Sequence, residues 1–273
     1  MASALFFSFF LRFALFFSKP FLFFGVLILN HLNEFTSIIR RGVDDYHMID
    51  AGDKVTVGVS GGKDSLVLLQ ALAHLKTYYP KPFELHALTL DLGFEDMDFS
   101  PVAEMCAKIG VPYTIIKTDI REIVFDVRKE ENPCSLCSKM RRGALNTAIR
   151  DLGSTKLALG HHSDDAIETY LMSLIFEGRI SCFKPVTYMS RAEIWQIRPM
   201  MYADEKRIER LCERLKLPIV PSTCPEDKDS KRYEIKQLIG ELESSYPDIR
   251  AKIFGAMKRL PLEGWGIPED DKT

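Results

Sequence analysis

The sequence predicts a doubly wound α/β fold, in which helices cover both faces of a parallel sheet and further helices follow at the C-terminal end. From residue 54 onward, short apolar runs alternate with stretches whose apolar residues recur at helical spacing. This alternation is typical of βαβ units. Ligands bind beyond the carboxyl ends of the strands in such sheets. The loops richest in Gly, Asp, His or Arg all follow predicted strands: 60–64, 91–94, 160–165 and 198–201.

Each element is predicted from its own pattern. The expected strands are the short apolar runs at 54–59, 85–90, 113–117, 156–159 and 193–197. The expected helices between and after them cover 65–75, 101–109, 164–176 and 204–215. Pro101 suits the first turn of its helix, and residues 230–260 predict two helices with a break near Pro247. We therefore expect one domain over residues 40–260 and a loose acidic tail at 263–273.

The first thirty residues differ from the rest, because residues 1–29 hold ten of the eighteen phenylalanines. Arg12, Lys19 and Pro20 interrupt the stretch, so its uncharged runs are shorter than the about 20 residues that span a bilayer. A clear secretory cleavage site is also missing. We interpret residues 1–30 as a hydrophobic N-terminal extension outside the working domain. A membrane-associating segment and a targeting remnant are the alternatives.

Composition limits the classes of partner. The chain is 46% hydrophobic and 27% charged, which is ordinary for a globular protein. Its net charge of −2 creates no global attraction to nucleic acid, so local basic patches would have to hold an RNA. A chain of 273 residues does not need disulfides to stabilise its core. We interpret its six cysteines as reduced thiols, which predicts a cytoplasmic protein.

The loop SGGKDS, between the first predicted strand and helix, has the features of a phosphate-binding loop. Gly61 and Gly62 let backbone N–H groups approach an anion, and the following helix N-terminus adds partial positive charge. The loop is not a Walker A motif, because three residues separate Gly58 from Gly62 and Asp64 follows Lys63. Asp64 beside a polyphosphate predicts an intervening Mg²⁺. The residues expected to bind the phosphates are Ser60, Gly61, Gly62, Lys63, Asp64 and Ser65.

The same loop resembles the PP-loop of the adenine-nucleotide α-hydrolase superfamily. That resemblance implies a Rossmann-like fold of the PP-loop ATP pyrophosphatase type. It also implies cleavage of ATP between the α and β phosphates and adenylation of a carbonyl oxygen. Nitrogen or sulfur then replaces that oxygen, and the loop does not decide which.

A Cys-x-x-Cys pair, Cys134 and Cys137, precedes the basic stretch 139–142, in which Arg141 and Arg142 would lower the thiol pKa values. Metal binding, redox chemistry and coincidence are all open for such a pair. Cys224 is the remaining candidate ligand. A structural zinc site would need four ligands, whereas three thiolates can hold a [4Fe–4S] cluster with one iron open. Persulfide chemistry is a further alternative. The other cysteines lie in apolar or helical contexts and are interpreted as buried: Cys106, Cys182 and Cys212.

Together with the loop, several strings resemble the tRNA 2-thiocytidine synthetase family over residues 40–260. They are CSLCSKMRRG at 134–143, GHHSDDAIET at 160–169, IRPM at 197–200, and the late Lys231, Arg232 and Lys236. The resemblance implies ATP, Mg²⁺ and a [4Fe–4S] cluster on Cys134, Cys137 and Cys224. It implies sulfur transfer to C2 of a cytidine in the tRNA anticodon loop. Some members carry a second cysteine in this late segment, whereas this chain has Ser222 near that place. The choice of Cys224 as third ligand therefore has less support from the resemblance.

Four further polar residues have candidate roles. Asp165 would be a second carboxylate for Mg²⁺ or for positioning the base, with helix capping as the alternative. His161 would contact the nucleotide or be a structural histidine. Asp91, at a strand end, suits recognition of adenosine. Arg198 would neutralise phosphate, with a surface salt bridge as the alternative.

We therefore interpret the chain as an ATP-dependent tRNA sulfurtransferase that forms 2-thiocytidine. The alternatives are a 2-thiouridine-forming thiolase, a lysidine-synthase-like nitrogen transferase, and a non-catalytic nucleotide-binding regulator. The expected partners are tRNA and a sulfur donor such as a cysteine desulfurase; a homodimer is left open and no firm membrane partner is expected. The basic residues that would bind RNA are Lys139, Arg141, Arg142, Lys228, Lys231, Arg232 and Lys236.

Overall fold

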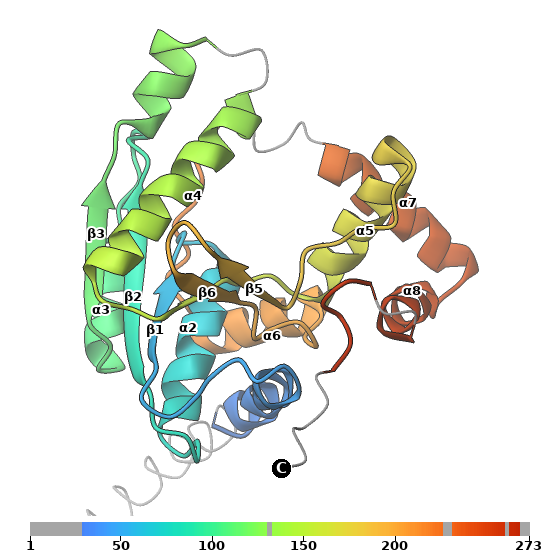
Figure 1. The fold of residues 1–273 in the computed structure, drawn as a ribbon, viewed down its shortest axis with the longest axis horizontal. Coiled ribbons are helices and arrows are strands. Elements are labelled where there is room, and N and C mark those ends of the chain that lie inside the picture. The colour runs from blue at the N-terminus through green and yellow to red at the C-terminus, as the bar shows by residue number, and fades with distance from the viewer. Residues whose placement is uncertain (1–28, 130–132, 226–230, 260–261, 268–273) are drawn as a thin grey trace, which may run out of the picture.

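The computed structural model describes residues 29–129, 133–225, 231–259 and 262–267 (Figure 1). Most of the N-terminal extension, residues 1–28, and the last six residues lie outside the described ranges. Residues 29–45 are helical and precede the sheet. Within the described ranges, no helix is both long enough and apolar enough to cross a membrane.

One mixed sheet forms the centre of the protein. Its strands are β1 (Lys54–Gly58), β2 (Glu84–Asp91), β3 (Tyr113–Lys117), β4 (Lys156–Ala158), β5 (Val186–Met189) and β6 (Ile194–Ile197). They are arranged in the order β3-β2-β1-β4-β6-β5, and every pair is parallel except β5 with β6. The predicted α/β class and its five strands are confirmed. The sixth strand, β5, was not predicted; it lies at one edge and pairs with β6 as an antiparallel hairpin.

Helices cover the sheet and continue beyond it, as predicted. They are α2 (Lys63–Lys76), α3 (Ser100–Lys108), α4 (Pro133–Asp151), α5 (Ser163–Glu177), α6 (Glu205–Leu215), α7 (Lys231–Ser245) and α8 (Ile249–Arg259). A π-helix, η1 (Glu122–Val127), precedes α4 and was not predicted. Helix α4 buries only Ala148 and Ile149 near its C-terminal end. Its N-terminal end, which carries Cys134 and Cys137, extends away from the sheet (Figure 1).

The order of the strands creates the switch point of the fold. Strand β1 pairs with β2 on one side and β4 on the other, with Val57 opposite Ala158. The loops that follow β1 and β4 therefore meet at the same edge of the sheet. A Cβ placed on Gly160 would lie 3.1 Å from the backbone N of Ser65. This close approach brings the SGGKDS loop and the GHHSDD string together.

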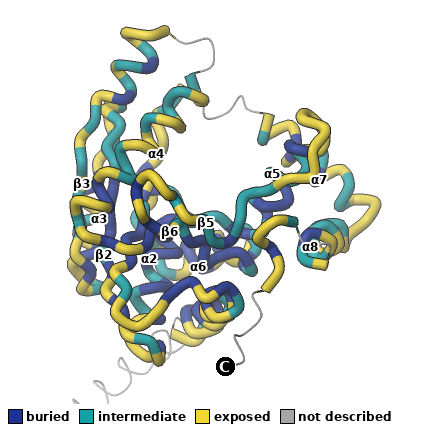
Figure 2. The backbone as a smooth tube through the Cα atoms, viewed as in Figure 1, coloured by how far each residue is buried: buried dark blue, intermediate teal, exposed yellow. Residues whose placement is uncertain are grey.

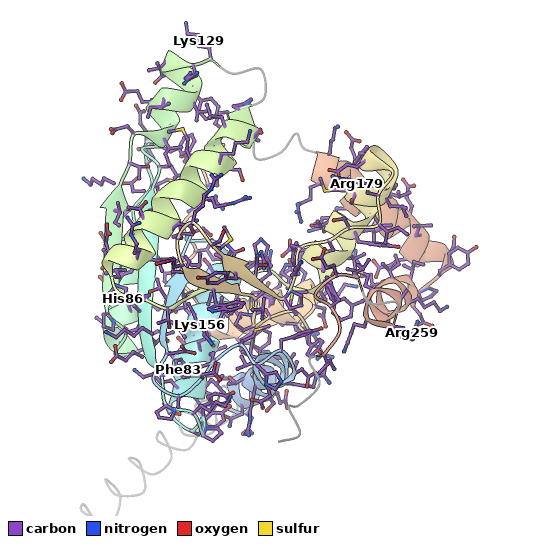
Figure 3. The ribbon with its side chains drawn as sticks, in the orientation of Figure 1. Phe83, His86, Lys129, Lys156, Arg179 and Arg259 are labelled. Atoms are coloured by element: carbon purple, nitrogen blue, oxygen red, sulfur yellow. The ribbon has the colours of Figure 1, made fainter. Side chains whose placement is uncertain are left out.

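Contacts at the amino end of β4 and near the C-terminus of the chain stabilise the sheet and the helices around it. Lys156, labelled in Figure 3, starts β4 and pairs through Nζ with Asp50 at 3.1 Å and Asp53 at 2.7 Å. Trp265 is 1% exposed, and its Nε1–H donates to Phe183 O at 3.1 Å. The tail was expected to be loose from Glu263, but Trp265 is packed into the core. Figure 2 shows the buried residues concentrated in the sheet and the helices against it.

Candidate active site

The SGGKDS loop forms a cradle of backbone groups. Ser65 Oγ accepts a hydrogen bond from Ser60 N at 3.2 Å and donates one to Gly62 O at 2.9 Å, so it holds the two arms of the loop together. Gly62 precedes α2 and makes no side-chain hydrogen bond to cap the helix. The first N–H groups of a helix have no intrahelical acceptor and form a natural anion site. The loop can therefore receive a phosphate at the start of α2.

Neighbouring segments enclose the loop tightly. Gly61 has φ of +86°, and a Cβ at this position would lie 2.8 Å from the Cβ of Val220 and 3.3 Å from the Phe99 ring. Val220 N also donates to Gly61 O at 3.0 Å. Glycine is required at Gly61 by both its backbone conformation and this contact. The segment that follows α6 is thus bonded directly to the loop.

A cavity of about 590 Å³ connects the loop with the three candidate cysteines. Its lining includes Ser60 and Gly62 on the loop, together with Cys134, Cys137 and Cys224. We call it the shared cavity. Residues about 160 positions apart in the sequence therefore line one partly open cavity, which the loop and the cysteines share.

Two aromatic residues that the sequence reasoning did not identify also line the shared cavity. Phe94 follows β2, and Phe125 lies on η1; their ring centroids are 5.9 Å apart with an interplanar angle of 69°. Edge-to-face pairs of this kind are favourable and leave ring surface for a planar ligand. Phe125 could not be identified, because nothing in residues 122–127 predicts a π-helix that turns this ring toward the cysteines.

The three cysteines come from two separate segments. Cys134 is exposed and Cys137 half-buried on the first turns of α4, while Cys224 is half-buried beyond α6. Burial raises the pKa of Cys137; Arg141 lowers it, and the neighbouring thiols of Cys224 and Cys134 raise it further. Arg141 lowers this pKa as expected, but burial outweighs its influence, so the net pKa of Cys137 is raised. All three cysteines line the shared cavity.

The cysteines of the shared cavity are a donor set for a metal cluster rather than for a single metal ion. Among the described residues, no group of three or more His, Cys, Asp or Glu side chains is spaced to hold a single metal ion. Three thiols around one cavity are the donors that a [4Fe–4S] cluster takes, with one iron left open. The residues therefore fit a cluster better than a structural zinc ion, which needs four ligands around one point.

Acidic residues gather beside the loop. Asp64 Oδ1 is buried without a hydrogen-bond partner in the described structure, at 3.5 Å from Lys63 Nζ and 3.8 Å from His162 Nε2. Burial raises the pKa of Asp64, opposed by Lys63. Asp165 Oδ2 lies 3.4 Å from His162 Nε2 and accepts from His162 N at 3.1 Å. Asp64 thus presents an unsatisfied carboxylate oxygen at the phosphate loop, as a cation ligand would.

The adjacent carboxylates tie the site to the C-terminal helices. Asp165 Oδ1 bonds Arg232 Nη1 of α7 at 3.1 Å. Asp164 is buried; its Oδ2 accepts from Glu205 N at the start of α6 at 2.8 Å, and its Oδ1 bonds Arg250 Nη1 at 2.6 Å. Capping accounts for the bonds from His162 N to Asp165 and from Glu205 N to Asp164, whereas Arg232 and Arg250 form ion pairs with these aspartates. A role of Asp165 in chemistry remains a prediction.

Asp91 and Arg198 lie at strand ends, as expected, but neither lines the shared cavity. Asp91 Oδ1 accepts from Gly93 N at 3.0 Å and so stabilises the turn after β2. Arg198 is 6% exposed and donates to Gln196 Oε1 at 2.7 Å and to Lys184 O. Burial lowers its pKa to about 10, so it stays charged at neutral pH. Its bonds go to neutral acceptors that brace β5 and β6, rather than to the salt bridge considered from the sequence.

His161 does not line the shared cavity either; it packs against Phe183, with ring centroids 5.0 Å apart. Burial lowers its pKa to about 4, and the nearby positive charge of Arg198 acts in the same direction. The imidazole is therefore neutral at physiological pH. The structural interpretation of this histidine matches these surroundings.

This burial predicts a pH dependence of stability. Because the pKa of His161 is about 4 when folded and about 6.5 when unfolded, the unfolded chain binds the proton first. The stabilisation is complete above about pH 6.5 and is lost as pH falls toward 4. The free energy of unfolding should be measured with urea at pH 7 and at pH 4.5. Its decrease between the two pH values should be smaller for His161→Gln than for the unaltered protein. Equal losses would contradict the burial argument.

Comparisons with known proteins agree on a family. A family model described as a PP-loop domain matches residues 34–242. A tRNA-cytidine(32) 2-sulfurtransferase from Alkalilimnicola ehrlichii is 39% identical over 222 residues, which are 81% of this chain and 71% of that protein. A protein of the same name from Pelobacter propionicus is 36% identical over 225 residues, with 81% and 84% covered. The chain belongs to the PP-loop family of tRNA-cytidine(32) 2-sulfurtransferases.

A solved structure extends the likeness of this sulfurtransferase to three dimensions. The U34-tRNA thiolase NcsA from Methanococcus maripaludis, with its [4Fe-4S] cluster, is 26% identical at a TM-score of 0.70. The match covers 84% of this chain and 78% of that chain. The predicted family and PP-loop fold are therefore confirmed.

The structure of the sulfurtransferase also reveals Glu205, which sequence reasoning did not single out. Its Oε1 lies 3.0 Å from Lys63 Nζ, and Lys236 Nζ contacts its two carboxylate oxygens at 2.9 and 2.8 Å. Burial alone would raise its pKa, but the two lysines hold it at about 2. An acidic residue in a first helical turn is common, because it complements the helix dipole. That ordinary context gives no signal of a partner 142 positions away.

The basic residues proposed for RNA binding fall into two groups. Lys139, Arg141 and Arg142 are exposed on α4. On α7, Arg232 and Lys236 are engaged by carboxylates of the protein. Lys228 lies outside the described residues. The α4 group is therefore the better candidate surface for a tRNA phosphate backbone in this sulfurtransferase.

Proposed function

We propose that this protein uses ATP to replace the C2 oxygen of a cytidine in the tRNA anticodon loop with sulfur. The observation that carries the proposal is the shared cavity, which the SGGKDS loop and three cysteines line together. The relatives named tRNA-cytidine(32) 2-sulfurtransferase support the choice of base. A base in an anticodon loop is single-stranded, so it can enter the cavity at low cost.

The reaction needs two displacements. The SGGKDS loop holds the phosphates of ATP while the base carbonyl oxygen attacks the α-phosphorus, forming an O–P bond and releasing pyrophosphate. A sulfur nucleophile then attacks C2, and the C–O bond breaks so that AMP leaves with the former carbonyl oxygen. The loop would position the α-phosphate next to the base carbonyl oxygen that attacks it.

Cys134, Cys137 and Cys224 would hold the cluster in our proposal. A [4Fe–4S] cluster with three protein ligands leaves one iron open, and an open iron binds sulfide. The cluster named for the U34-tRNA thiolase NcsA supports this assignment. Arg141, which also lines the shared cavity, favours the thiolate form of Cys137 and would compensate negative charge around the thiolates.

Mg²⁺ is the second proposed cofactor, with Asp64 as its ligand. The buried, unsatisfied Oδ1 of Asp64 supports this choice, because carboxylate oxygens are the ligands that Mg²⁺ prefers. The ion would reduce the repulsion between that carboxylate and the polyphosphate. Asp165 would position the reacting groups through its contacts with His162 and Arg232.

The proposed partners follow from this chemistry. The exposed basic residues of α4 would contact the tRNA backbone, and a cysteine desulfurase or free sulfide would supply the sulfur. We propose the cytoplasm as location, because ATP, tRNA and reduced thiols occur there. A homodimer stays a prediction without a supporting contact.

The experiment is anaerobic incubation with ATP, Mg²⁺, sulfide and a tRNA transcript, followed by mass spectrometry of the nucleosides. We expect 2-thiocytidine and one AMP and one pyrophosphate for each sulfur transferred. Thiouridine would instead favour the second candidate, a uridine thiolase, which the likeness to NcsA supports. ATP turnover to ADP, or a base modified with nitrogen, would overturn the proposal.

A further inference from the structure

Two lysines from different helices converge on one carboxylate at the phosphate loop. Lys63 is the first residue of α2, and Lys236 lies on α7. Both ammonium groups lie within 3.0 Å of Glu205 Oε1, and Lys236 contacts Oε2 at 2.8 Å. The Glu205 side chain is only 18% exposed. The two ammonium groups form an anion-binding site, and the carboxylate of Glu205 occupies it.

One of the two lysines of this anion-binding site, Lys63, belongs to the loop that the proposed function assigns to ATP. Lys63 is the only lysine of the SGGKDS loop, so Glu205 and a phosphate bound at the loop would share one ammonium group. A polyphosphate carries more negative charge and more acceptor oxygens than one carboxylate. It would therefore compete with Glu205 for Lys63.

Helix α7 holds Lys236 in place through a second, independent contact. Arg232 lies one turn before Lys236, so the two side chains project from the same face of α7. Arg232 Nη1 bonds Asp165 Oδ1 at 3.1 Å and Glu168 Oε2 at 3.0 Å, and its Nη2 donates to Thr169 Oγ1 at 3.2 Å. Lys236 would thus stay close to Lys63 if Glu205 moved aside.

We propose that Lys236 is a phosphate-binding residue that α7 supplies to ATP, and that Glu205 competes with the β- or γ-phosphate for the place between Lys236 and Lys63. The inference rests on the proposed function, because it takes ATP as the ligand of the loop. It adds a nucleotide contact from the C-terminal helices, which lie beyond the sheet and the loop. Helix α7 is then part of the ATP site rather than only a surface for RNA.

The test is equilibrium binding of α,β-methylene-ATP and of AMP, measured by calorimetry on the full-length protein with Mg²⁺. Lys236→Gln should weaken binding of the ATP analogue by about tenfold, the usual loss for one charge-assisted contact. Its affinity for AMP should not change, because AMP lacks the β- and γ-phosphates. Glu205→Gln removes the competitor and should strengthen binding of the analogue. Lys206→Gln, at an exposed lysine next to Glu205, is the matched control and should bind like the unaltered protein.

Several outcomes would overturn the inference. Unchanged affinity of Lys236→Gln for the analogue excludes a phosphate contact, and equal losses for AMP and the analogue indicate a structural role instead. Weaker binding by Glu205→Gln means that Glu205 positions Lys63 rather than competes. If the unaltered protein binds no ATP analogue at all, the proposed function fails first, and that result is distinct from a failure confined to Lys236.

Discussion

Replacing Cys134 with serine is expected to abolish sulfur transfer while ATP binding is retained. Cys134 lines the shared cavity at the end formed by α4, whereas the phosphate contacts come from the loop after β1. Loss of outer-shell partners alone costs 10–100-fold in metal sites, so loss of a ligand should reduce transfer to less than about one-hundredth. Iron content after anaerobic purification, ATP-analogue affinity and thiolated nucleoside should be measured on the same preparation.

The matched control for this prediction is Cys182→Ser. Cys182 is half-buried outside the shared cavity, and its Sγ lies 3.4 Å from Ala166 O, an acceptor that a serine hydroxyl can also use. This variant should keep its iron and its activity. If Cys134→Ser loses ATP binding together with sulfur transfer, the Cys-x-x-Cys pair is structural. If it retains transfer, the cysteine assignment is wrong.

The second large effect is expected for Gly61→Ala, which should destabilise the fold by on the order of 3 kcal/mol and weaken ATP binding. A non-glycine residue in the left-handed region costs about 1–2 kcal/mol, and overpacking adds a similar amount. Gly61 has φ of +86°, and its added methyl group would lie 2.8 Å from the Cβ of Val220. The free energy of unfolding should be measured with urea in the absence of nucleotide.

Gly62→Ala provides the comparison within the same loop. Gly62 has φ of −76°, and the nearest atom to an added Cβ is Ser60 Oγ at 3.5 Å. This change should alter stability by less than about 1 kcal/mol, because the backbone conformation is open to alanine. A loss for Gly62→Ala as large as that for Gly61→Ala would show that loop flexibility, rather than the contact with Val220, limits stability.

Most of the sheet could be predicted from the sequence, because buried parallel strands have continuous apolar runs. Strand β5 lacks such a run; Tyr188 is half-exposed and pairs across the hairpin with Trp195 at 4.9 Å. The π-helix η1 could not be predicted either, because no local pattern distinguishes it from a loop. Both departures depend on contacts with other elements, so local propensity does not show them.

The residues of the candidate site likewise fall into those that the sequence predicts and those that depend on contacts between distant elements. Residues in loops after strands, such as Ser60, could be placed at the carboxyl edge from topology alone. The direction of a side chain could not be predicted in this way. Asp91 and Arg198 lie at the expected edge, but their side chains form hydrogen bonds with Gly93 and Gln196 instead. Glu205 was missed because its partners are distant in the sequence and meet only after folding.

The hydrogen bond from Val220 N to Gly61 O has a consequence for engineering. Cys224 follows Val220 by four residues, a length of chain that reaches at most about 14 Å. The third cysteine is therefore tethered to the nucleotide loop through a short backbone strap. A chimera that exchanged residues 217–225 for those of another thiolase would also exchange the wall against which Gly61 packs. Exchanging this segment should therefore change both nucleotide binding and the position of the third cysteine. A chimera that keeps both properties would have to include the SGGKDS loop together with residues 217–225.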